Sequence, residues 1–365
     1  MQATAAIIES QGGKFVIDKV DIEDPRDGEV LVKVVAAGVC HTDLSVRDQY
    51  YPTPLPAVLG HEGAGIIEKV GPGVNGLAVG DRVVLSFGYC GQCRSCLTGE
   101  HAYCPSLFPL NFAGRRMDGS TPITRNGQDV NAMFFGQSSF ATYAIARQNN
   151  CVKVPDDAAL ELLGPLGCGL QTGAGTILNA LKPRPGSTIA IFGVGSVGLS
   201  AVMAAKLSGC TRIIAVDQRA SRLELARELG ATDTIDATKL DALETIQTMT
   251  GGGVDYAMDT TAIPKVLRQA IDCTHNSGEC AVVGGAPLGT EVSVDMNTML
   301  FGRKLRGVVE GSSTPQVFIP QLISLQKAGL FPFERLIKMY DFDQINQAVE
   351  DTEKTGVAIK AVLRM

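Results

Sequence analysis

The sequence predicts an α/β protein of two domains, in which a doubly wound parallel sheet is inserted into a β-rich domain. Three observations support this prediction. Short apolar runs alternate with helical segments in the middle of the chain, apolar runs in the first third are divided by Gly and Pro, and the tail returns to mixed character. The chain has 365 residues, which is enough for two domains. We expect residues 1–169 and 313–365 to form one domain and residues 170–312 the other.

The first third is expected to be mostly β-strand. The apolar runs Val30–Ala37, Gly65–Val70 and Arg82–Leu85 are too short for typical helices and lie in Gly- and Pro-rich surroundings. A Cys-rich loop follows at residues 90–104. Residues 105–140 are predicted to be irregular, because they carry many Gly, Asn and aromatic residues.

The middle of the chain is expected to form βαβ units with right-handed crossovers and a parallel sheet. The predicted strands are Thr188–Phe192, Arg212–Asp217, Val254–Met258 and Cys280–Val283. The predicted helices between them are Gly195–Ser208, Ser221–Leu229 and Pro264–Cys273.

Composition is that of an ordinary soluble protein, with 45% hydrophobic and 19% charged residues. The net charge of −6 argues against nucleic acid or acidic membranes as partners. Leu162–Leu181 and Ser187–Ala205 are long uncharged runs, but their many Gly residues favour buried soluble segments over membrane spans. The start resembles no secretory signal, so we expect a cytoplasmic protein whose clustered Cys residues bind metal or act in catalysis.

A Gly-rich turn predicts a dinucleotide site. Gly193, Gly195 and Gly198 form G-x-G-x-x-G between a predicted strand and a predicted helix, and Asp217 ends the next strand. The helix N-terminus would face the pyrophosphate, and the Asp217 carboxylate would bind the adenosine ribose and repel a 2′-phosphate, which favours NAD over NADP. Arg219 and Arg222 follow closely and could weaken that repulsion. The alternative is a Gly-rich turn with a purely structural role.

Four cysteines predict a structural zinc site. Cys90, Cys93, Cys96 and Cys104 are spaced C-x2-C-x2-C-x7-C, and four thiolates this close can enclose one tetrahedral zinc and leave no open position. An iron–sulfur cluster is the main alternative, because ferredoxins also use short Cys spacings. Unrelated thiols are a further alternative.

A second set of possible ligands is dispersed along the chain. It comprises Cys40, His61, Glu62 and Cys168, and no local spacing marks these residues as a set. His61 lies in Gly60-His61-Glu62-Gly63 and is a reasonable metal ligand, whereas either Cys could equally be an inert buried thiol.

Several of these motifs occur together in a known family. Listed in order, they are Gly38-Val39-Cys40-His41-Thr42-Asp43, Gly60-His61-Glu62-Gly63, the four-Cys loop, Gly167-Cys168-Gly169 and the Gly-rich turn. Over essentially its whole length the chain resembles the zinc-dependent medium-chain alcohol dehydrogenases. Phe108–Phe112, Phe134–Phe140 and Glu161–Gly169 carry a finer resemblance to the aryl (benzyl) alcohol and geraniol dehydrogenases.

The resemblance implies a GroES-like catalytic domain that contains an inserted Rossmann NAD-binding domain, and two zinc ions per chain. It implies that Cys40, His61 and Cys168 bind the catalytic zinc, with the fourth position open. Asp43 would hold the other ring nitrogen of His61, and Glu62 would lie behind the metal as a transient ligand. Thr42 would take the hydroxyl proton of the substrate.

The resemblance also implies cofactor contacts. Thr172 and Val197 would lie near nicotinamide, Val283 would contact the cofactor, and Lys360 would contact the pyrophosphate. Arg222 and His41 would also contact the cofactor. The chain departs from many relatives at two positions, because His41 stands where they have Arg, and Ser45 stands where a His often ends the proton relay. The alternative for His41 is a side chain that faces solvent.

Aromatic residues indicate the substrate. Nearly half of them fall between residues 87 and 143, around the expected substrate channel. Phe87 and Phe112 are the preferred pocket residues, although such rings could simply fill the core. The expected reaction is therefore reversible oxidation of a primary aromatic or allylic alcohol, of the benzyl alcohol type, to the aldehyde with hydride transfer to NAD. A geraniol-type terpene alcohol is the alternative substrate.

Two other classes of protein fit the sequence less well. A zinc-binding module that reads nucleic acid would need a basic surface, which the four-Cys loop lacks. A zinc-free quinone-type reductase should lack Cys40, His61 and Cys168 together. The expected partners are therefore a small-molecule alcohol or aldehyde, no nucleic acid and no membrane, within a homodimer or homotetramer.

Overall fold

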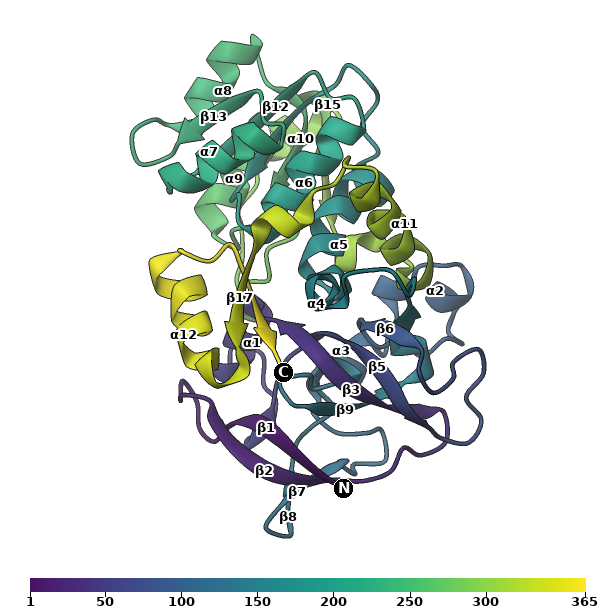
Figure 1. The fold of residues 1–365 in the computed structure, drawn as a ribbon. Helices are drawn as coiled ribbons and strands as arrows, with labels where there is room; N and C mark the ends of the chain where they lie inside the picture. The colour runs from purple at the N-terminus through teal and green to yellow at the C-terminus, as the bar shows by residue number, and fades with distance from the viewer. The chain divides into compact units, whose positions relative to one another are not determined.

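The structure, a computed structural model, describes residues 1–365 and divides into two compact units (Figure 1). Unit 1 comprises Met1–Gly169, Thr314–Ser324 and Phe333–Met365. Unit 2 comprises Leu170–Ser313 and Leu325–Pro332.

Unit 1 is built on two mainly antiparallel sheets. The first has the order β4-β1-β2-β7-β8, and the second has the order β10-β6-β5-β3-β18-β17, with β9 also paired to β3. The strands are β1 Gln2–Ile8, β2 Val16–Ile22, β3 Glu29–Gly38, β4 Ala57–Val58, β5 Glu62–Val70, β6 Arg82–Leu85, β7 Ile123–Arg125, β8 Gln128–Val130, β9 Tyr143–Arg147, β10 Cys151–Lys153, β17 Ile337–Asp341 and β18 Lys360–Arg364.

The helices of unit 1 are short. They are α1 His41–Arg47, α2 Arg94–Leu97, α3 Leu107–Phe112, α4 Leu160–Leu163 and α12 Ile345–Glu350, and α11 Pro315–Lys327 begins in this unit. Residues 105–140, predicted to be irregular, contain α3 and the hairpin β7–β8. That prediction was wrong in part, because these elements are too short to show a periodic pattern.

Strand β3 forms the centre of the second sheet. Most of its residues are buried on both faces, which explains why its sequence is a nearly continuous apolar run. It pairs with β5 in antiparallel register, with Gly38 opposite Glu62, and with β18. Three segments that are distant in the sequence therefore meet at the carboxyl end of β3.

Unit 2 is a six-stranded parallel sheet of order β13-β12-β11-β14-β15-β16. The strands are β11 Thr188–Phe192, β12 Arg212–Asp217, β13 Asp233–Asp236, β14 Val254–Asp259, β15 Thr274–Val282 and β16 Lys304–Gly307. The helices are α5 Gly169–Gly175, α6 Ser196–Leu207, α7 Ala220–Leu229, α8 Ala242–Thr250, α9 Pro264–Asp272 and α10 Met296–Leu300. This order is that of a doubly wound dinucleotide-binding sheet, as the sequence predicted.

The two long uncharged runs are not single helices. Leu162–Leu181 is divided among α4, a turn, α5 and a π-helical turn, and Ser187–Ala205 contains β11 and most of α6. No helix in the structure has the length and apolarity needed to cross a membrane.

Candidate functional site

Four possible metal ligands that are dispersed in the sequence meet in unit 1. Cys40 follows β3 and caps α1, His61 and Glu62 lie at the start of β5, and Cys168 precedes α5. Since Gly38 pairs with Glu62, the ends of β3 and β5 bring the first three side chains together. One ligand atom from each of the four residues lies within 4.8 Å of the others, and this set is called the Cys40 cluster below.

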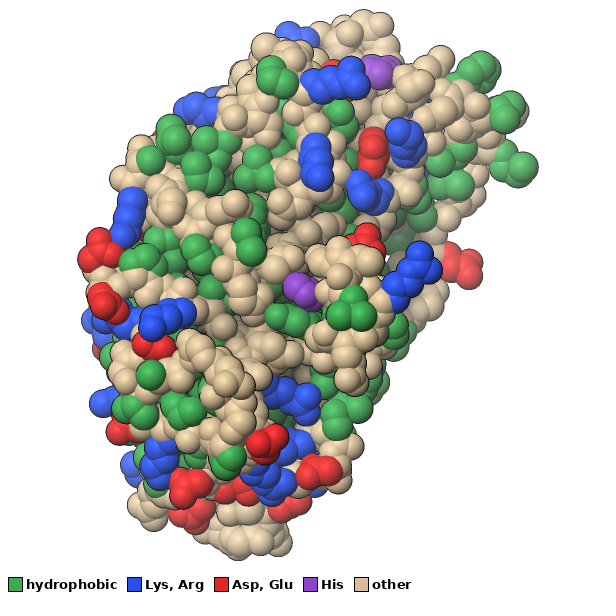
Figure 2. Space-filling model, turned by 90° about the vertical axis from the view of Figure 1, so that its right-hand side faces the viewer, with side chains coloured by type: hydrophobic (Ala, Val, Ile, Leu, Met, Phe, Trp, Pro, Cys, Tyr) green, Lys and Arg blue, Asp and Glu red, His purple; other side chains and the backbone are tan.

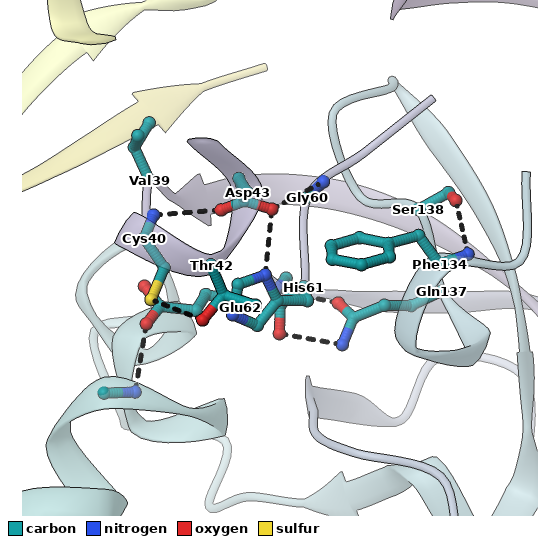
Figure 3. A network of polar contacts seen from close by, with 12 residues as sticks. Val39, Cys40, Thr42, Asp43, Gly60, His61, Glu62, Phe134, Gln137 and Ser138 are labelled. Atoms are coloured by element: carbon teal, nitrogen blue, oxygen red, sulfur yellow. Dashed lines mark hydrogen bonds and ion pairs between the residues drawn. The ribbon is translucent and has the colours of Figure 1, made fainter. Parts of the chain in front are cut away.

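His61 is oriented by a carboxylate through one ring nitrogen, and its other ring nitrogen has no hydrogen-bond partner. Its Nδ1 lies 2.8 Å from Oδ1 of Asp43, and both side chains are fully buried (Figure 3). Its Nε2 is buried and has no hydrogen-bond partner. A buried nitrogen without a partner is costly, and an Asp-oriented imidazole beside two thiols has the donors that zinc prefers. The Cys40 cluster therefore fits a zinc ion.

Asp43 also holds the two backbone segments that carry the ligands. Its Oδ2 accepts a hydrogen bond from the backbone N–H of Cys40, at 2.9 Å, and its Oδ1 accepts one from Gly60, at 3.1 Å. A hydrogen bond from Cys168 lowers the pKa of the Cys40 thiol well below its usual value, in spite of burial. The thiolate is the form that binds a metal.

Glu62 and Lys360 form a buried ion pair behind the ligands. The Nζ of Lys360 lies 2.9 Å from both carboxylate oxygens of Glu62 and 3.2 Å from the carbonyl oxygen of Val39. Burial raises the pKa of Glu62 to about 7, although the charge of Lys360 opposes that shift. From the family resemblance, Lys360 is expected to contact the pyrophosphate. In the structure its ammonium lies within hydrogen-bond distance of three acceptors and serves as the counter-ion of the buried Glu62 carboxylate.

The remaining residues of helix α1 differ in exposure. Oγ1 of Thr42 lies 3.9 Å from Sγ of Cys40, so this hydroxyl is next to the Cys40 cluster. Ser45 is buried and His41 is exposed.

Aromatic rings form one wall beside His61. Phe135 and Phe134 lie with ring centroids 4.4 and 5.4 Å from the imidazole. Phe112 packs against both of these rings, at 5.2 and 5.9 Å. Phe87 is buried and packs on Tyr89 instead. Of the two pocket residues selected from sequence, only Phe112 belongs to this wall.

Phe134 and Phe135 were not selected from sequence as site residues. Their stretch carries the finer resemblance and belongs to the aromatic-rich segment 87–143, so the density of aromatic residues is the available signal. Phe135 has a left-handed backbone conformation with φ of 50°, which no sequence pattern announces for Phe.

The four-Cys loop forms a second compact cluster in unit 1. Sγ of Cys90 lies 3.9 Å from that of Cys96, and Sγ of Cys93 lies 3.9 Å from that of Cys104. Four sulfurs about 2.3 Å from one zinc ion lie about 3.8 Å apart, so the spacing fits zinc. Backbone N–H groups of Gln92 and Cys93 lower the pKa of Cys90 to about 6.

The Gly-rich turn in unit 2 is tightly built. Gly193 has φ of 80°, and a Cβ at Gly198 would lie 2.0 Å from the carbonyl oxygen of Gly193, so neither position tolerates a side chain. A Cβ at Gly195 would meet only the Arg222 guanidinium, at 3.7 Å, which leaves the backbone there open to a ligand. Helix α6 begins directly after it, so its free N–H groups suit a pyrophosphate.

Asp217 lies beside the Gly-rich turn and ends β12, the strand end at which the sequence predicted it. Its Oδ2 accepts a hydrogen bond from the N–H of Val194 at 2.8 Å, and the guanidinium of Arg222 lies 3.8 Å away. The other expected cofactor residues of this unit are half-buried, namely Thr172, Val197 and Val283.

Comparisons with known proteins agree with this architecture. Residues 26–156 match the alcohol dehydrogenase GroES-like domain, and residues 196–326 match the zinc-binding dehydrogenase domain. The chain is 47% identical to a geraniol dehydrogenase from Castellaniella defragrans, over 100% of this chain and 98% of that protein.

Two solved structures are similar over the full length of the chain. One is a benzyl alcohol dehydrogenase from Acinetobacter calcoaceticus, with 50% identity, a TM-score of 0.97 and coverage of 100% of this chain and 99% of that one. The other is an alcohol dehydrogenase zinc-binding domain protein from Burkholderia ambifaria, with 54% identity, a TM-score of 0.98 and the same coverage.

Proposed function

Because the chain belongs to the zinc-dependent medium-chain alcohol dehydrogenase family, we propose that it oxidises primary aromatic or allylic alcohols to aldehydes, reversibly, with NAD as hydride acceptor. The observation that carries this proposal is the buried Nε2 of His61, which has no hydrogen-bond partner and lies in a cluster with two thiols. We expect Cys40, His61 and Cys168 to hold a catalytic zinc, and Cys90, Cys93, Cys96 and Cys104 to hold a structural one.

When bound, zinc supplies a Lewis acid that makes a substrate hydroxyl more acidic, and NAD supplies the hydride acceptor. The residues of the chain provide orientation and proton transfer. Asp43 holds His61 in the tautomer that leaves Nε2 free for a metal. We expect Thr42, whose Oγ1 lies 3.9 Å from Sγ of Cys40, to accept the hydroxyl proton of the alcohol. Ser45 cannot act as a base as the His of many relatives does, so we expect the proton to leave Thr42 by another route.

The preference for NAD rests on Asp217. A carboxylate at the end of the second strand of the sheet accepts hydrogen bonds from a ribose and repels a 2′-phosphate. Gly193, Gly195 and Gly198 permit close approach of the pyrophosphate to α6.

The substrate class rests on the ring wall. Phe134 and Phe135 pack against His61, Phe112 packs on both of them, and an aromatic lining suits a flat or unsaturated alcohol. The relatives named benzyl alcohol dehydrogenase and geraniol dehydrogenase are similar to this chain to nearly the same degree. We favour a benzylic substrate, and geraniol is the second candidate.

A steady-state comparison tests the substrate assignment. NADH formation is measured with benzyl alcohol, cinnamyl alcohol, geraniol and ethanol. We expect kcat/KM for benzyl alcohol to exceed that for ethanol by at least about tenfold, which is about 1.4 kcal/mol. A preference for ethanol contradicts the proposal, and a preference for geraniol over benzyl alcohol selects the alternative.

A second test concerns the metal. The Cys168→Ser variant loses one sulfur ligand of the Cys40 cluster, whereas the matched variant Cys151→Ser alters another buried thiol of unit 1. We expect about two zinc ions per wild-type chain, one in Cys168→Ser with loss of dehydrogenase activity, and two in Cys151→Ser. A Cys168→Ser protein that keeps full activity contradicts the proposal.

We also propose self-association through unit 2. Strand β16 forms an edge of the sheet and is exposed, and the adjoining Met296, Leu300 and Phe301 are 85%, 79% and 62% exposed. Figure 2 shows hydrophobic side chains projecting at its upper right. An unpaired strand edge beside an apolar patch suits a second copy of the chain. Light scattering of Phe301→Asp should then give a lower mass than wild type.

A further inference from the structure

Segment 137–140 lies along residues 58–60, the segment that leads from β4 to His61. The backbone N–H of Phe140 donates to the carbonyl of Leu59 at 3.0 Å, and that of Ser139 donates to the carbonyl of Gly60 at 2.8 Å. The hydroxyl of Ser138 donates to the carbonyl of Val58 at 2.7 Å. These contacts resemble those of a neighbouring strand, and they run toward the Cys40 cluster.

Gln137 continues this series with its side chain. Its Oε1 accepts a hydrogen bond from the N–H of Gly63 at 3.0 Å, and its Nε2 donates to the carbonyl of His61 at 2.9 Å (Figure 3). The side chain is fully buried. The amide therefore bridges the backbone on both sides of Glu62. The pairing of β5 with β6 starts only at Ala64, so β6 does not pair with this part of the backbone.

The same amide also reaches the segment that leads to the third ligand. Nε2 of Gln137 lies 3.5 Å from the carbonyl oxygen of Ser86, and the hydroxyl of Ser86 donates to the carbonyl of Gly167 at 2.7 Å. Gly167 directly precedes Cys168. A short chain of contacts thus connects the backbone of His61 with the backbone beside Cys168.

The turn that presents Gln137 is held in a costly conformation. Phe135 and Ser138 both have positive φ, of 50° and 48°, which costs about 1–3 kcal/mol for each non-Gly residue. Two contacts from outside the turn hold it there, because Asn150 donates to the carbonyl of Phe135 and the hydroxyl of Ser138 donates to the carbonyl of Val58. Within the turn, the Ser138 hydroxyl also accepts from the N–H of Phe134. Strain of this kind clusters at functional sites.

We propose that Gln137 is a positioning residue that sets the orientation of His61 relative to Cys168 and so tunes the affinity and geometry of the catalytic metal. This inference rests on the proposed zinc in the Cys40 cluster. Because Gln137 holds both backbone groups around Glu62, losing its amide leaves two buried polar groups unpaired and frees the His61 segment to shift. Removing an outer partner of a metal ligand typically costs about 10–100-fold in metal affinity.

The experiment compares the full-length wild type with Gln137→Met, Gln137→Glu and Asn346→Leu. Met keeps the volume of Gln and loses both bonds. Glu keeps the acceptor for Gly63. Asn346 is a matched control, because its amide also accepts from and donates to one backbone residue, Phe15, at 2.9 Å each, and it belongs to the same unit.

Zinc is titrated against a chelator with an indicator dye, and the visible spectrum of the Co²⁺-loaded protein is recorded. We expect Gln137→Met to release one of its two zinc ions at least about tenfold more readily than wild type and to show a shifted cobalt band. The second zinc, in the four-Cys loop, should be unaffected and serves as an internal control. Gln137→Glu should lie between Met and wild type, and Asn346→Leu should lose stability without change in either metal readout.

Two results distinguish a failure of the inference from a failure of the proposed function. If wild type holds two zinc ions and Gln137→Met holds both with wild-type affinity and an unchanged cobalt spectrum, Gln137 has no positioning role. If wild type holds no zinc outside the four-Cys loop, the proposed function itself fails. Should Gln137→Met not fold, Gln137→Glu decides, because wild-type metal affinity in that variant also contradicts the inference.

Discussion

The ammonium of Lys360 lies 2.9 Å from both carboxylate oxygens of Glu62, and the two side chains are 2% and 0% exposed. The residues are 298 positions apart in the sequence. The pair joins β18 to the start of β5 and so connects Lys360 with the Cys40 cluster, of which Glu62 is a member. Since neither charge is solvated by water, each depends on the other.

Replacing Lys360 should therefore be costly. Lys360→Met leaves the Glu62 carboxylate buried without a counter-ion, and we expect a loss of about 3–5 kcal/mol in the free energy of unfolding. Lys360→Arg keeps the charge and should lose less. Urea unfolding monitored by circular dichroism measures both, and equal stabilities for Met and wild type would contradict the role assigned to this pair.

Acid should weaken a second network, around Asp351. Hydrogen bonds from Tyr340, Lys338 and Gln347 lower the pKa of Asp351 from 3.8 to about 2. Since the pKa is lower in the folded protein, the stabilising contribution is complete above pH 3.8 and is lost as the pH falls toward about 2. The stability difference between wild type and Asp351→Asn should shrink over that interval. Asp343→Asn, at an exposed position, is the control.

The ring wall should discriminate among substrates. Phe112→Ala removes a ring that packs on Phe134 and Phe135, and such contacts are worth about 0.5–1.5 kcal/mol. We expect kcat/KM for benzyl alcohol to fall about 2- to 10-fold, with a smaller change for ethanol. Phe108→Ala, which removes a ring that is 44% exposed, should change this ratio less. Equal losses for both alcohols in Phe112→Ala would argue that the ring only fills the core.

Cofactor choice should respond to Asp217. Asp217→Asn keeps an acceptor for the N–H of Val194 but removes the charge that opposes a 2′-phosphate. We expect the ratio of kcat/KM for NAD to that for NADP to fall by about tenfold, or about 1.4 kcal/mol. An unchanged ratio, measured with one alcohol at saturation, would show that another residue excludes NADP.

His41 tests a departure from the usual family pattern. Its imidazole is exposed, and Arg at this position would carry a permanent charge and more donors. We expect His41→Arg to bind NADH a few-fold more tightly, by up to about 1 kcal/mol, with weaker dependence on pH. Fluorescence titration of NADH across the pH range measures this. If affinity and pH dependence both stay the same, His41 makes no contact with the cofactor.

The sequence predicted the parallel sheet well where strands are buried on both faces. Thr188–Phe192 and Arg212–Asp217 were predicted with the bounds that the structure has, because central parallel strands read as continuous apolar runs. β13 and β16 were missed, since they lie at the two edges of the sheet and carry polar sequences, DTID and KLRG.

The two candidate metal sites differ in how far the sequence alone reveals them. The four-Cys loop is local and can be recognised from spacing alone. Cys40, His61 and Cys168 are brought together by the register of β3 against β5 and by the turn before α5, so the family resemblance was needed to group them. The bridge made by Gln137 left no trace in the sequence pattern, because a side-chain amide bound to backbone produces no periodicity.

The pairing of β18 with β3 has a consequence for the order in which the molecule is made. The four-Cys loop has all its sulfurs once residue 104 has left the ribosome, so we expect the zinc proposed for it to bind while most of unit 2 is still untranslated. The counter-ion of Glu62 arrives only with Lys360. Nascent chains arrested before Lys360 is made should therefore already carry the zinc of the four-Cys loop. The Cys40 cluster of these chains would still lack the ammonium that neutralises Glu62.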